Sequence, residues 1–315
     1  MTTIIDSPAN WQRADIEHRT DEWIHQLSQD EIAEIEAALH TAKSRGKTFD
    51  TLTKEDFPLP RVGDLLQTTL HDLENGLGLK VLRGFPALEH TKDDMRLIYW
   101  GLGKHLGTAV SQSFRGDILG DVKNLNIDVN SPRGRGYTTN QRLNFHTDSC
   151  DVVALMVLRA AKSGGMSLIA SSVAIHNEIA RTRPDLLEVL YQPFYWSWQG
   201  QEAPGELPYY QQPIFTMHEG HFACRYISAH IRSAQRFDDV PRLTEAQTEA
   251  LELLTGLAND PKFHLAMMFE PGDVQLLNNH VTLHARTEFE DYEEEDQRRH
   301  LIRMWLSVPN SRPLS

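Results

Sequence analysis

The chain has 315 residues, of which 40% are apolar, so it is long enough to bury a sizeable core. A formal net charge of −13 argues against nucleic acid or an anionic membrane surface as a partner. Its two cysteines, Cys150 and Cys224, exclude a disulfide framework, and no apolar run approaches the roughly 20 residues of a membrane span. The first residues lack the pattern of a signal peptide, so we expect a cytoplasmic protein.

Residues 1–75 are expected to form mainly helix and loop. The tetrapeptide Ser28-Gln29-Asp30-Glu31 is a capping box, in which the serine and the glutamate each bind an amide of the other residue. Apolar residues then recur at helical spacing, which predicts a helix over 29–45 that ends at Gly46. A second helix is expected over 91–105.

The rest of the chain reads as strands with inserted helices. An apolar run over 79–83 predicts the first core strand. Residues 111–141 are rich in Gly, Asn, Ser and Arg, which favours strands and long loops at the mouth of a barrel. Further strands are expected over 144–149, 152–158, 274–277 and 299–306, and further helices over 173–181, 184–190 and 245–257.

No internal repeat and no break in composition marks a linker. We therefore predict one domain over residues 1–315, of the α+β class with a mainly β core. Residues 1–75 would be a helical addition, and residues 76–315 the core with helical insertions. The aromatic segment 195–212 has two interpretations, a lid over a substrate or a loop packed on the core.

The tripeptide His146-Thr147-Asp148 is the strongest chemical signal in the chain. Residues two apart on a strand point to the same face, so one short strand can aim His146 and Asp148 at a single point. With His284 from a later strand, they make the two-histidine, one-carboxylate set of non-haem Fe(II) oxygenases. Taken alone, the tripeptide is equally compatible with a polar strand end and a hydrogen-bonded core histidine.

Further motifs occur with this tripeptide in a characteristic order. They are Gly78 to Gly84, Asn144 to Asp148, Gly164-Gly165-Met166-Ser167, Asn279 to Arg286, and Arg299 to Arg303. On these motifs the chain resembles the TauD/TfdA-like Fe(II)/2-oxoglutarate-dependent dioxygenases, from about Gly78 to its end. The resemblance implies a jelly-roll core, also called a double-stranded β-helix. It also implies oxidation of a small organic substrate, coupled to conversion of 2-oxoglutarate and O2 to succinate and CO2.

The resemblance implies the identity of the metal ligands. The family pattern places the second histidine after Leu283, which selects His284 rather than His280. Raw affinity does not select iron among divalent metals, but O2 activation needs a metal that reaches a higher oxidation state. Halogenating relatives lack the carboxylate ligand, so the presence of Asp148 argues against halogenation.

A cosubstrate pocket is implied by a second set of residues. The 5-carboxylate of 2-oxoglutarate needs a buried counter-charge, which a guanidinium supplies through two parallel hydrogen bonds. By resemblance, Arg299 is this partner, Ser167 donates to the same carboxylate, and Arg303 faces the inner pocket near the substrate or cosubstrate. Alternatively, the arginines pair with the acidic run 288–296. Arg286 has two possible partners, Asp148 or a loop carbonyl.

We therefore expect an Fe(II)/2-oxoglutarate-dependent dioxygenase in which His146, Asp148 and His284 hold the iron and O2 is the second cosubstrate. Hydroxylation is favoured, although desaturation and ring formation use the same site. Two other functions are considered: a metal-binding barrel with lyase or isomerase activity, and a non-catalytic binding protein of the same fold. Arg303 and nearby aromatic residues favour a small-molecule substrate that carries a carboxylate or another anion.

Overall fold

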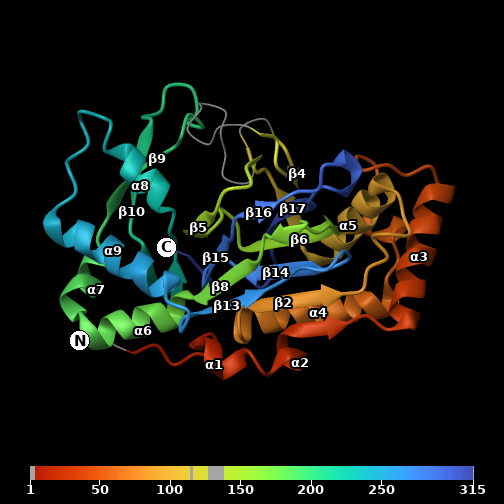
Figure 1. The fold of residues 1–315 in the computed structure, drawn as a ribbon, viewed down its shortest axis with the longest axis horizontal. Coiled ribbons are helices and arrows are strands. Elements are labelled where there is room, and N and C mark those ends of the chain that lie inside the picture. Colours follow the sequence, from red (N-terminus) through yellow and green to blue (C-terminus); the bar gives the residue numbers. More distant parts are fainter. Residues whose placement is uncertain (1–3, 114–115, 127–137, 315) are drawn as a thin grey trace.

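The computed structural model describes residues 4–113, 116–126 and 138–314. Two β-sheets form its centre, with helices on the outer side of each (Figure 1). The larger sheet has the order β1-β2-β14-β6-β17-β3, and β4 also pairs with β17. The smaller sheet has the order β13-β8-β15-β5. Strand β1 runs parallel to β2, whereas the other pairs in both sheets are antiparallel.

The strands of the two sheets are short and dominated by apolar residues. Those of the larger sheet are β1 (Ile24–Gln26), β2 (Leu79–Arg83), β3 (Thr108–Val110), β4 (Leu119–Val122), β6 (Val152–Arg159), β14 (Val274–Asn278) and β17 (His300–Ser307). Those of the smaller sheet are β5 (Leu143–His146), β8 (Ser167–Ser171), β13 (His264–Met267) and β15 (Thr282–Arg286). Three two-stranded ribbons join β7 (Ser163–Gly164) to β16 (Phe289–Glu290), β9 (Phe194–Ser197) to β10 (Tyr209–Gln212), and β11 (Phe215–His218) to β12 (His221–Cys224).

The helices begin at recognisable caps. Ser28 and Glu31 form the expected capping box of α3, and Thr244 and Gln247 form a second capping box at the start of α9. Pro184 is the first residue of α7, where a missing amide hydrogen costs nothing. The helices are α1 (Arg13–Ile16), α2 (Thr20–Trp23), α3 (Gln29–Ser44), α4 (Pro60–Asn75), α5 (Lys92–Leu106), α6 (Ser172–Thr182), α7 (Pro184–Leu190), α8 (Ser228–Ala234) and α9 (Glu245–Asn259), with 3-10 turns η1 (Lys54–Asp56) and η3 (Glu295–Gln297).

Alternation along the strands separates an inner face from an outer face on each sheet. In β17, Leu301 packs into the core between the sheets, whereas Ile302 and Met304 pack against α3, α4 and α5. In β8, Ile169 faces the inner core, and Leu168 belongs to the outer core with α6, α7 and α9. Two antiparallel sheets packed face to face in this way confirm the expected jelly roll.

The structure corrects one local expectation. Strand β5 ends at His146, so Thr147 and Asp148 lie in the loop that follows it rather than on a strand over 144–149. The first 75 described residues are mainly helix and loop, as expected, and β1 adds a short strand to the edge of the larger sheet. Part of the predicted segment 111–141 lies outside the described residues; its described part includes β4.

The aromatic segment 195–212 contributes β10 and most of β9, which pair as a ribbon. Trp196 is fully buried in the outer core beside the smaller sheet, as the packed interpretation predicts at that position. Trp198, by contrast, is 36% exposed and lies against Tyr210, with ring centroids 4.1 Å apart. The ribbon therefore has a buried side, which carries Trp196, and an open side, which carries Trp198.

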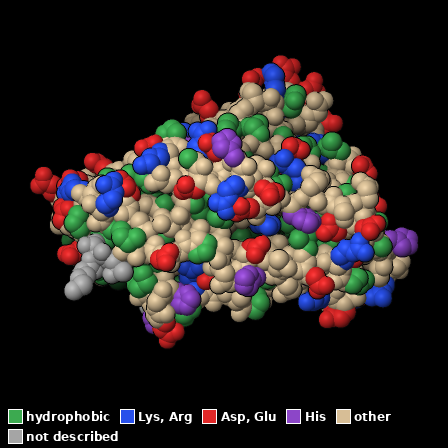
Figure 2. All heavy atoms as spheres, turned by 90° about the horizontal axis from the view of Figure 1, so that it is seen from below, with side chains coloured by type: hydrophobic (Ala, Val, Ile, Leu, Met, Phe, Trp, Pro, Cys, Tyr) green, Lys and Arg blue, Asp and Glu red, His purple; other side chains and the backbone are tan. Residues whose placement is uncertain are grey.

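The surface is mixed in charge. Acidic and basic side chains are interspersed over the face shown in Figure 2. In the described ranges, no helix combines the length and apolar character needed to cross a bilayer.

A buried ion pair connects the turn before β14 to β2. The side chain of Asp273 is fully buried and accepts two hydrogen bonds from Arg83, at 2.8 and 2.9 Å. It also accepts a hydrogen bond from the backbone amide of Glu270 at 2.9 Å, and this bond stabilises the turn.

We predict that Asp273→Ala lowers the free energy of unfolding by about 3 kcal/mol, because it leaves Arg83 without its buried partner. The value is at the low end of the usual range because Arg83 keeps an ion pair with Glu270 at 2.7 Å. Urea unfolding followed by circular dichroism measures the change. Lys162→Ala removes an exposed pair with Glu290 and should leave the transition nearly unchanged. Equal effects from the two variants would contradict the prediction.

Candidate active site

Three potential metal ligands converge on the inner side of the smaller sheet. His146 is the last residue of β5, and His284 lies directly opposite it in β15. Asp148 follows in the loop, with its carboxylate oxygens 3.9 Å from His146 Nε2 and 3.7 Å from His284 Nε2. One potential ligand atom from each residue falls within 4.8 Å of the others. The arrangement offers one face of ligands to a single ion and leaves its other face open.

Asp148 is positioned by residues from distant parts of the chain. Its backbone amide donates to Asn279 Oδ1 at 3.0 Å, which replaces the strand pairing that the loop lacks. Its Oδ2 accepts from Trp305 Nε1 at 2.9 Å and lies 3.5 Å from Arg303. Burial alone would raise the pKa of Asp148, but Arg303 and the two histidines hold it below its usual value. The carboxylate is therefore ionised and oriented.

Both histidines present a ring nitrogen that is free to bind a metal. His146 Nδ1 lies 2.9 Å from the carbonyl of Asn144, so a proton there leaves Nε2 unprotonated and directed at Asp148. Burial, with a further contribution from His146, lowers the pKa of His284 to about 3. A metal needs neutral imidazole, and the burial of His284 keeps its ring neutral near neutral pH.

His280, the alternative histidine, lies elsewhere. Its Nε2 is 3.3 Å from Asp151 Oδ1, and its backbone amide donates to Asn278 Oδ1. It is not part of the group formed by His146, Asp148 and His284.

Arg299 is a buried cation at the residue before β17. It is 4% exposed, and within the described ranges its Nη1 has no hydrogen-bond partner. Burial, reinforced by the charge of Arg286, lowers its pKa to about 9. The acidic run 288–296 contributes only Asp291, which accepts the backbone amide of Arg299 at 2.8 Å. No ion pair to the Arg299 side chain is found among the described residues, so the pairing alternative is not supported.

Two neighbouring motifs complete the surroundings of Arg299. Gly165 has φ +70°, and a Cβ there would lie 3.3 Å from Arg299 Nε, so the Gly-Gly turn permits this close approach. Ser167 is buried, and its Oγ hydrogen-bonds the Gln275 side chain at 3.1 Å. Arg286 lies opposite Ser167 in the β15–β8 register. Its side chain donates to the carbonyls of Thr139 and Gln141, so of its two expected partners the structure shows the loop carbonyl.

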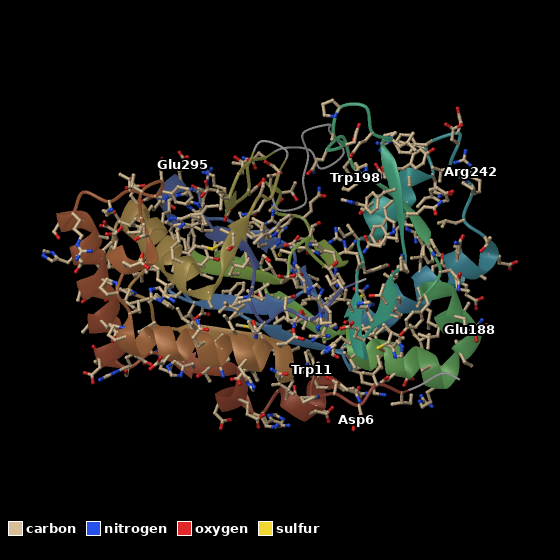
Figure 3. The ribbon with its side chains drawn as sticks, turned by 180° about the vertical axis from the view of Figure 1, so that it is seen from behind. Asp6, Trp11, Glu188, Trp198, Arg242 and Glu295 are labelled. Atoms are coloured by element: carbon tan, nitrogen blue, oxygen red, sulfur yellow. The ribbon has the colours of Figure 1, made fainter. Side chains whose placement is uncertain are left out.

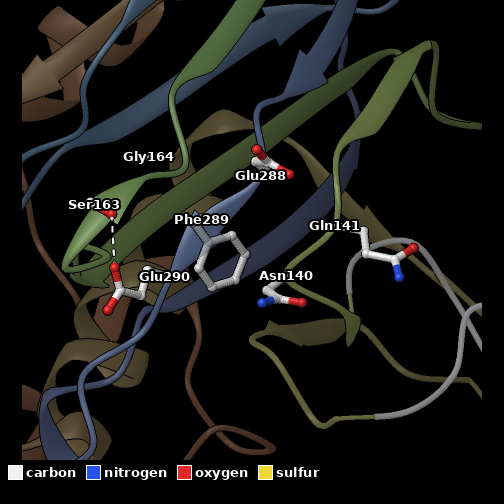
Figure 4. A pocket seen from close by; sticks show the side chains of 7 residues that line it. All are labelled: Asn140, Gln141, Ser163, Gly164, Glu288, Phe289 and Glu290. Carbon is white, nitrogen blue, oxygen red and sulfur yellow. Dashed lines mark hydrogen bonds between the residues drawn. The ribbon is translucent and has the colours of Figure 1, made fainter.

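A cavity of about 500 Å³ lies beside β7 and β16, and the metal ligands are not among its lining residues (Figure 4). Its lining residues are Asn140, Gln141, Ser163, Gly164, Glu288, Phe289 and Glu290. The ring of Phe289 lies 4.8 Å from the Arg286 guanidinium and 5.0 Å from that of Arg299. Phe289 is thus shared by the cavity and the two cations.

The residues fit an iron ion and a dicarboxylate. Two imidazoles and one carboxylate suit Fe(II), while a buried guanidinium with a free donor suits a carboxylate. Sequence reasoning missed Trp305 as a partner of Asp148. The signal was available, because Trp305 is two residues after Arg303 and shares its strand face.

This combination of a jelly roll with a two-histidine, one-carboxylate group defines a class of non-haem iron enzymes. Residues 42–305 match the family model described as taurine catabolism dioxygenase TauD, TfdA family, and the chain belongs to this family. It is accordingly a 2-oxoglutarate-dependent dioxygenase that uses Fe(II) and O2.

Individual relatives agree with the assignment. FR-33289 synthase from Streptomyces rubellomurinus is 34% identical over 319 residues, covering 99% of this chain and 94% of the relative. The taurine hydroxylase-like protein SAT17 from Stachybotrys chartarum is 30% identical over 291 residues, covering 88% and 73%. A solved asparagine oxygenase, in complex with Fe(II), 3-hydroxyasparagine and succinate, superposes with a TM-score of 0.68 at 18% identity, covering 90% and 93%, and shows the same fold.

We predict that His146→Ala, Asp148→Ala and His284→Ala each greatly weaken Fe(II) binding, because each removes one of three convergent ligands. His280→Ala is the matched control and should bind iron normally, since it loses only its contact with Asp151. Anaerobic titration with Fe(II) measures the affinities. Lost binding in the control together with normal binding in His284→Ala would overturn the choice of ligand.

A second prediction concerns the orientation of Asp148. Trp305→Phe removes the hydrogen bond to its Oδ2 and should lower Fe(II) affinity by roughly tenfold, the smaller effect typical of residues that orient a ligand. Trp23→Phe removes an indole hydrogen bond to the Ile16 carbonyl in the same inner core and serves as the control. Unchanged affinity in Trp305→Phe, or an equal loss in both variants, would refute the orienting role.

Proposed function

We propose that the enzyme hydroxylates a small organic molecule that carries an anionic group. In this proposal His146, Asp148 and His284 hold Fe(II), and Arg299 with Ser167 holds the 5-carboxylate of 2-oxoglutarate. One observation carries it: a convergent group of metal ligands shares the interior of the jelly roll with a buried arginine whose Nη1 has no hydrogen-bond partner among the described residues.

Neighbouring residues orient the proposed ligands and limit the access of water to the site. When bound, Fe(II) with 2-oxoglutarate supplies the O2-dependent oxidation of a substrate C–H bond. Trp305 and Arg303 keep Asp148 ionised and correctly oriented. Gln275 holds the Ser167 hydroxyl beside β15, and Arg299 keeps a donor for the incoming carboxylate. The apolar inner core around Leu301 and Ile169 limits water inside the barrel.

The relatives support both the reaction and the substrate class. The asparagine oxygenase was solved with 3-hydroxyasparagine, a hydroxylated product that carries an α-carboxylate. SAT17 is described as taurine hydroxylase-like, and taurine carries a sulfonate. Both molecules are small and contain an anionic group, which agrees with the cationic residues around this site.

The proposal also assigns the protein to the cytoplasm. Cys150 and Cys224 are free thiols, which suit a reducing compartment. Such a compartment would keep the iron reduced as Fe(II), as the proposed reaction requires.

The function is tested by succinate release from a panel of small carboxylates, sulfonates and phosphates, with product analysis by mass spectrometry. A substrate-dependent increase in succinate with a product heavier by one oxygen atom supports hydroxylation. A product that has lost two hydrogens would indicate desaturation or ring formation instead. Metal-dependent turnover without succinate would favour a lyase or isomerase.

We predict that Arg299→Ala lowers 2-oxoglutarate affinity by roughly 10²- to 10³-fold or more, because breaking a buried charged pair costs about 3–5 kcal/mol. Fe(II) binding should survive, since the ligands are unchanged. Arg299→Lys should restore only part of the affinity, because an ammonium does not form the bidentate contact.

The visible charge-transfer band of the Fe(II)–2-oxoglutarate complex, titrated under argon, measures this affinity. Arg298→Ala is the matched control, because the described partners of the Arg298 side chain are the carbonyls of Tyr292 and Glu293. Arg303→Ala should change 2-oxoglutarate binding less than Arg299→Ala does. The reverse order for Arg299 and Arg303 would show that their roles are exchanged.

A further inference from the structure

Arg225 reaches the metal site from a part of the chain that carries none of the expected ligands. It follows β12, and its backbone amide donates to the carbonyl of Ile214. Its side chain extends to the loop after β5, where Nη1 lies 3.4 Å from the carbonyl of Asp148 and Nη2 donates to Ser149 Oγ. The guanidinium therefore lies beside the backbone of the carboxylate ligand.

The charge of Arg225 is not neutralised by the described part of the protein. No carboxylate there lies within ion-pair distance of it, and its Nε is buried without a hydrogen-bond partner. Arg303 differs, because it pairs with Asp148 and donates to Gln112 Oε1 at 2.7 Å. A buried donor on a cation without a counter-charge is unfavourable, and an anionic ligand would relieve the cost.

Aromatic residues of the β9–β10 ribbon stand next to this cation. Burial raises the pKa of Tyr210, while the charge of Arg225 and a hydrogen bond to it oppose the rise. The Tyr210 ring contacts Trp198 on the open side of the ribbon, at the end of the molecule seen in Figure 3. From the metal loop outward, the guanidinium of Arg225, the phenol of Tyr210 and the indole of Trp198 thus lie in sequence. Such a set suits a ligand with an anionic head and an apolar part.

We propose that Arg225, assisted by the Tyr210 hydroxyl, binds the anionic group of the primary substrate beside Asp148. This inference rests on the proposed function and names the residue that selects its substrate class. Arg299 serves the cosubstrate carboxylate, and Arg225 serves a separate carboxylate, sulfonate or phosphate on the molecule to be oxidised. Holding that head group next to the Asp148 backbone would keep the rest of the substrate close to the metal.

The test uses acetate, methanesulfonate and inorganic phosphate as probes. Each is titrated by calorimetry into protein loaded with Fe(II) and saturating 2-oxoglutarate under argon, so that the Arg299 site is filled. Wild-type protein should bind at least one probe, and the strongest identifies the head group. Arg225→Gln should weaken that binding by roughly 10- to 100-fold, the effect of losing a charged hydrogen bond. Arg225→Lys should recover part of it.

Arg242→Gln is the control, because it removes one exposed positive charge from the same end of the molecule (Figure 3). It should bind the probe as the wild type does. Absence of probe binding in wild type, or equal binding in Arg225→Gln, would overturn the inference. So would an equal loss in Arg242→Gln, which would indicate a general charge effect.

The visible charge-transfer band of the Fe(II)–2-oxoglutarate complex distinguishes failure of this inference from failure of the proposed function. Arg225→Gln should keep the band, because its iron ligands are intact. Loss of the band in that variant would mean that Arg225 merely positions Asp148, and the inference would fail. Absence of the band in the wild type would instead refute the proposed iron and 2-oxoglutarate site. For any substrate that the succinate screen identifies, Arg225→Gln should raise KM far more than it lowers kcat.

Discussion

The antiparallel register between β5 and β15 is the constraint on which the site depends. It sets His146 opposite His284, with their ring centroids 4.3 Å apart. Side chains alternate along each strand, so the same register sends Phe145 and Leu283 to the outer core beneath α6 and α9. A slip of one residue would exchange the two faces, removing the ligands from the interior and burying imidazole among apolar helices.

Positive charge inside the barrel is distributed unequally. Arg303 is paired with Asp148, whereas Arg299 and Arg225 retain buried nitrogen atoms without a partner in the described structure. Such groups reduce the stability of the empty protein, because burial of an unpaired donor is unfavourable. Their locations differ, one beside Gly165 and the other beside Asp148. The two proposed anion sites are therefore separate, and no carboxylate of the described ranges forms an ion pair with the side chain of either arginine.

Sequence patterns predicted the helices and strands whose signals are local in the sequence. The capping box at Ser28 and the apolar runs of β2 and β6 are local signals, and each lies within about one residue of the element it predicts. The loop containing Asp148 was misassigned as strand, because it is held by Asn279 and Tyr226, far away in the sequence. Arg225 was missed for the same reason, since only the folded chain brings β12 to the loop after β5.

The placement of Asp148 off the strand has a thermodynamic consequence. Its loop is held by the β14–β15 turn through Asn279, by β17 through Trp305, and by the segment after β12 through Arg225 and Tyr226. A ligand that binds only when these elements are docked makes their separation less frequent. Iron held by Asp148 would therefore stabilise the contacts between segments distant in sequence, and amide hydrogen exchange in all three should slow together when the metal binds.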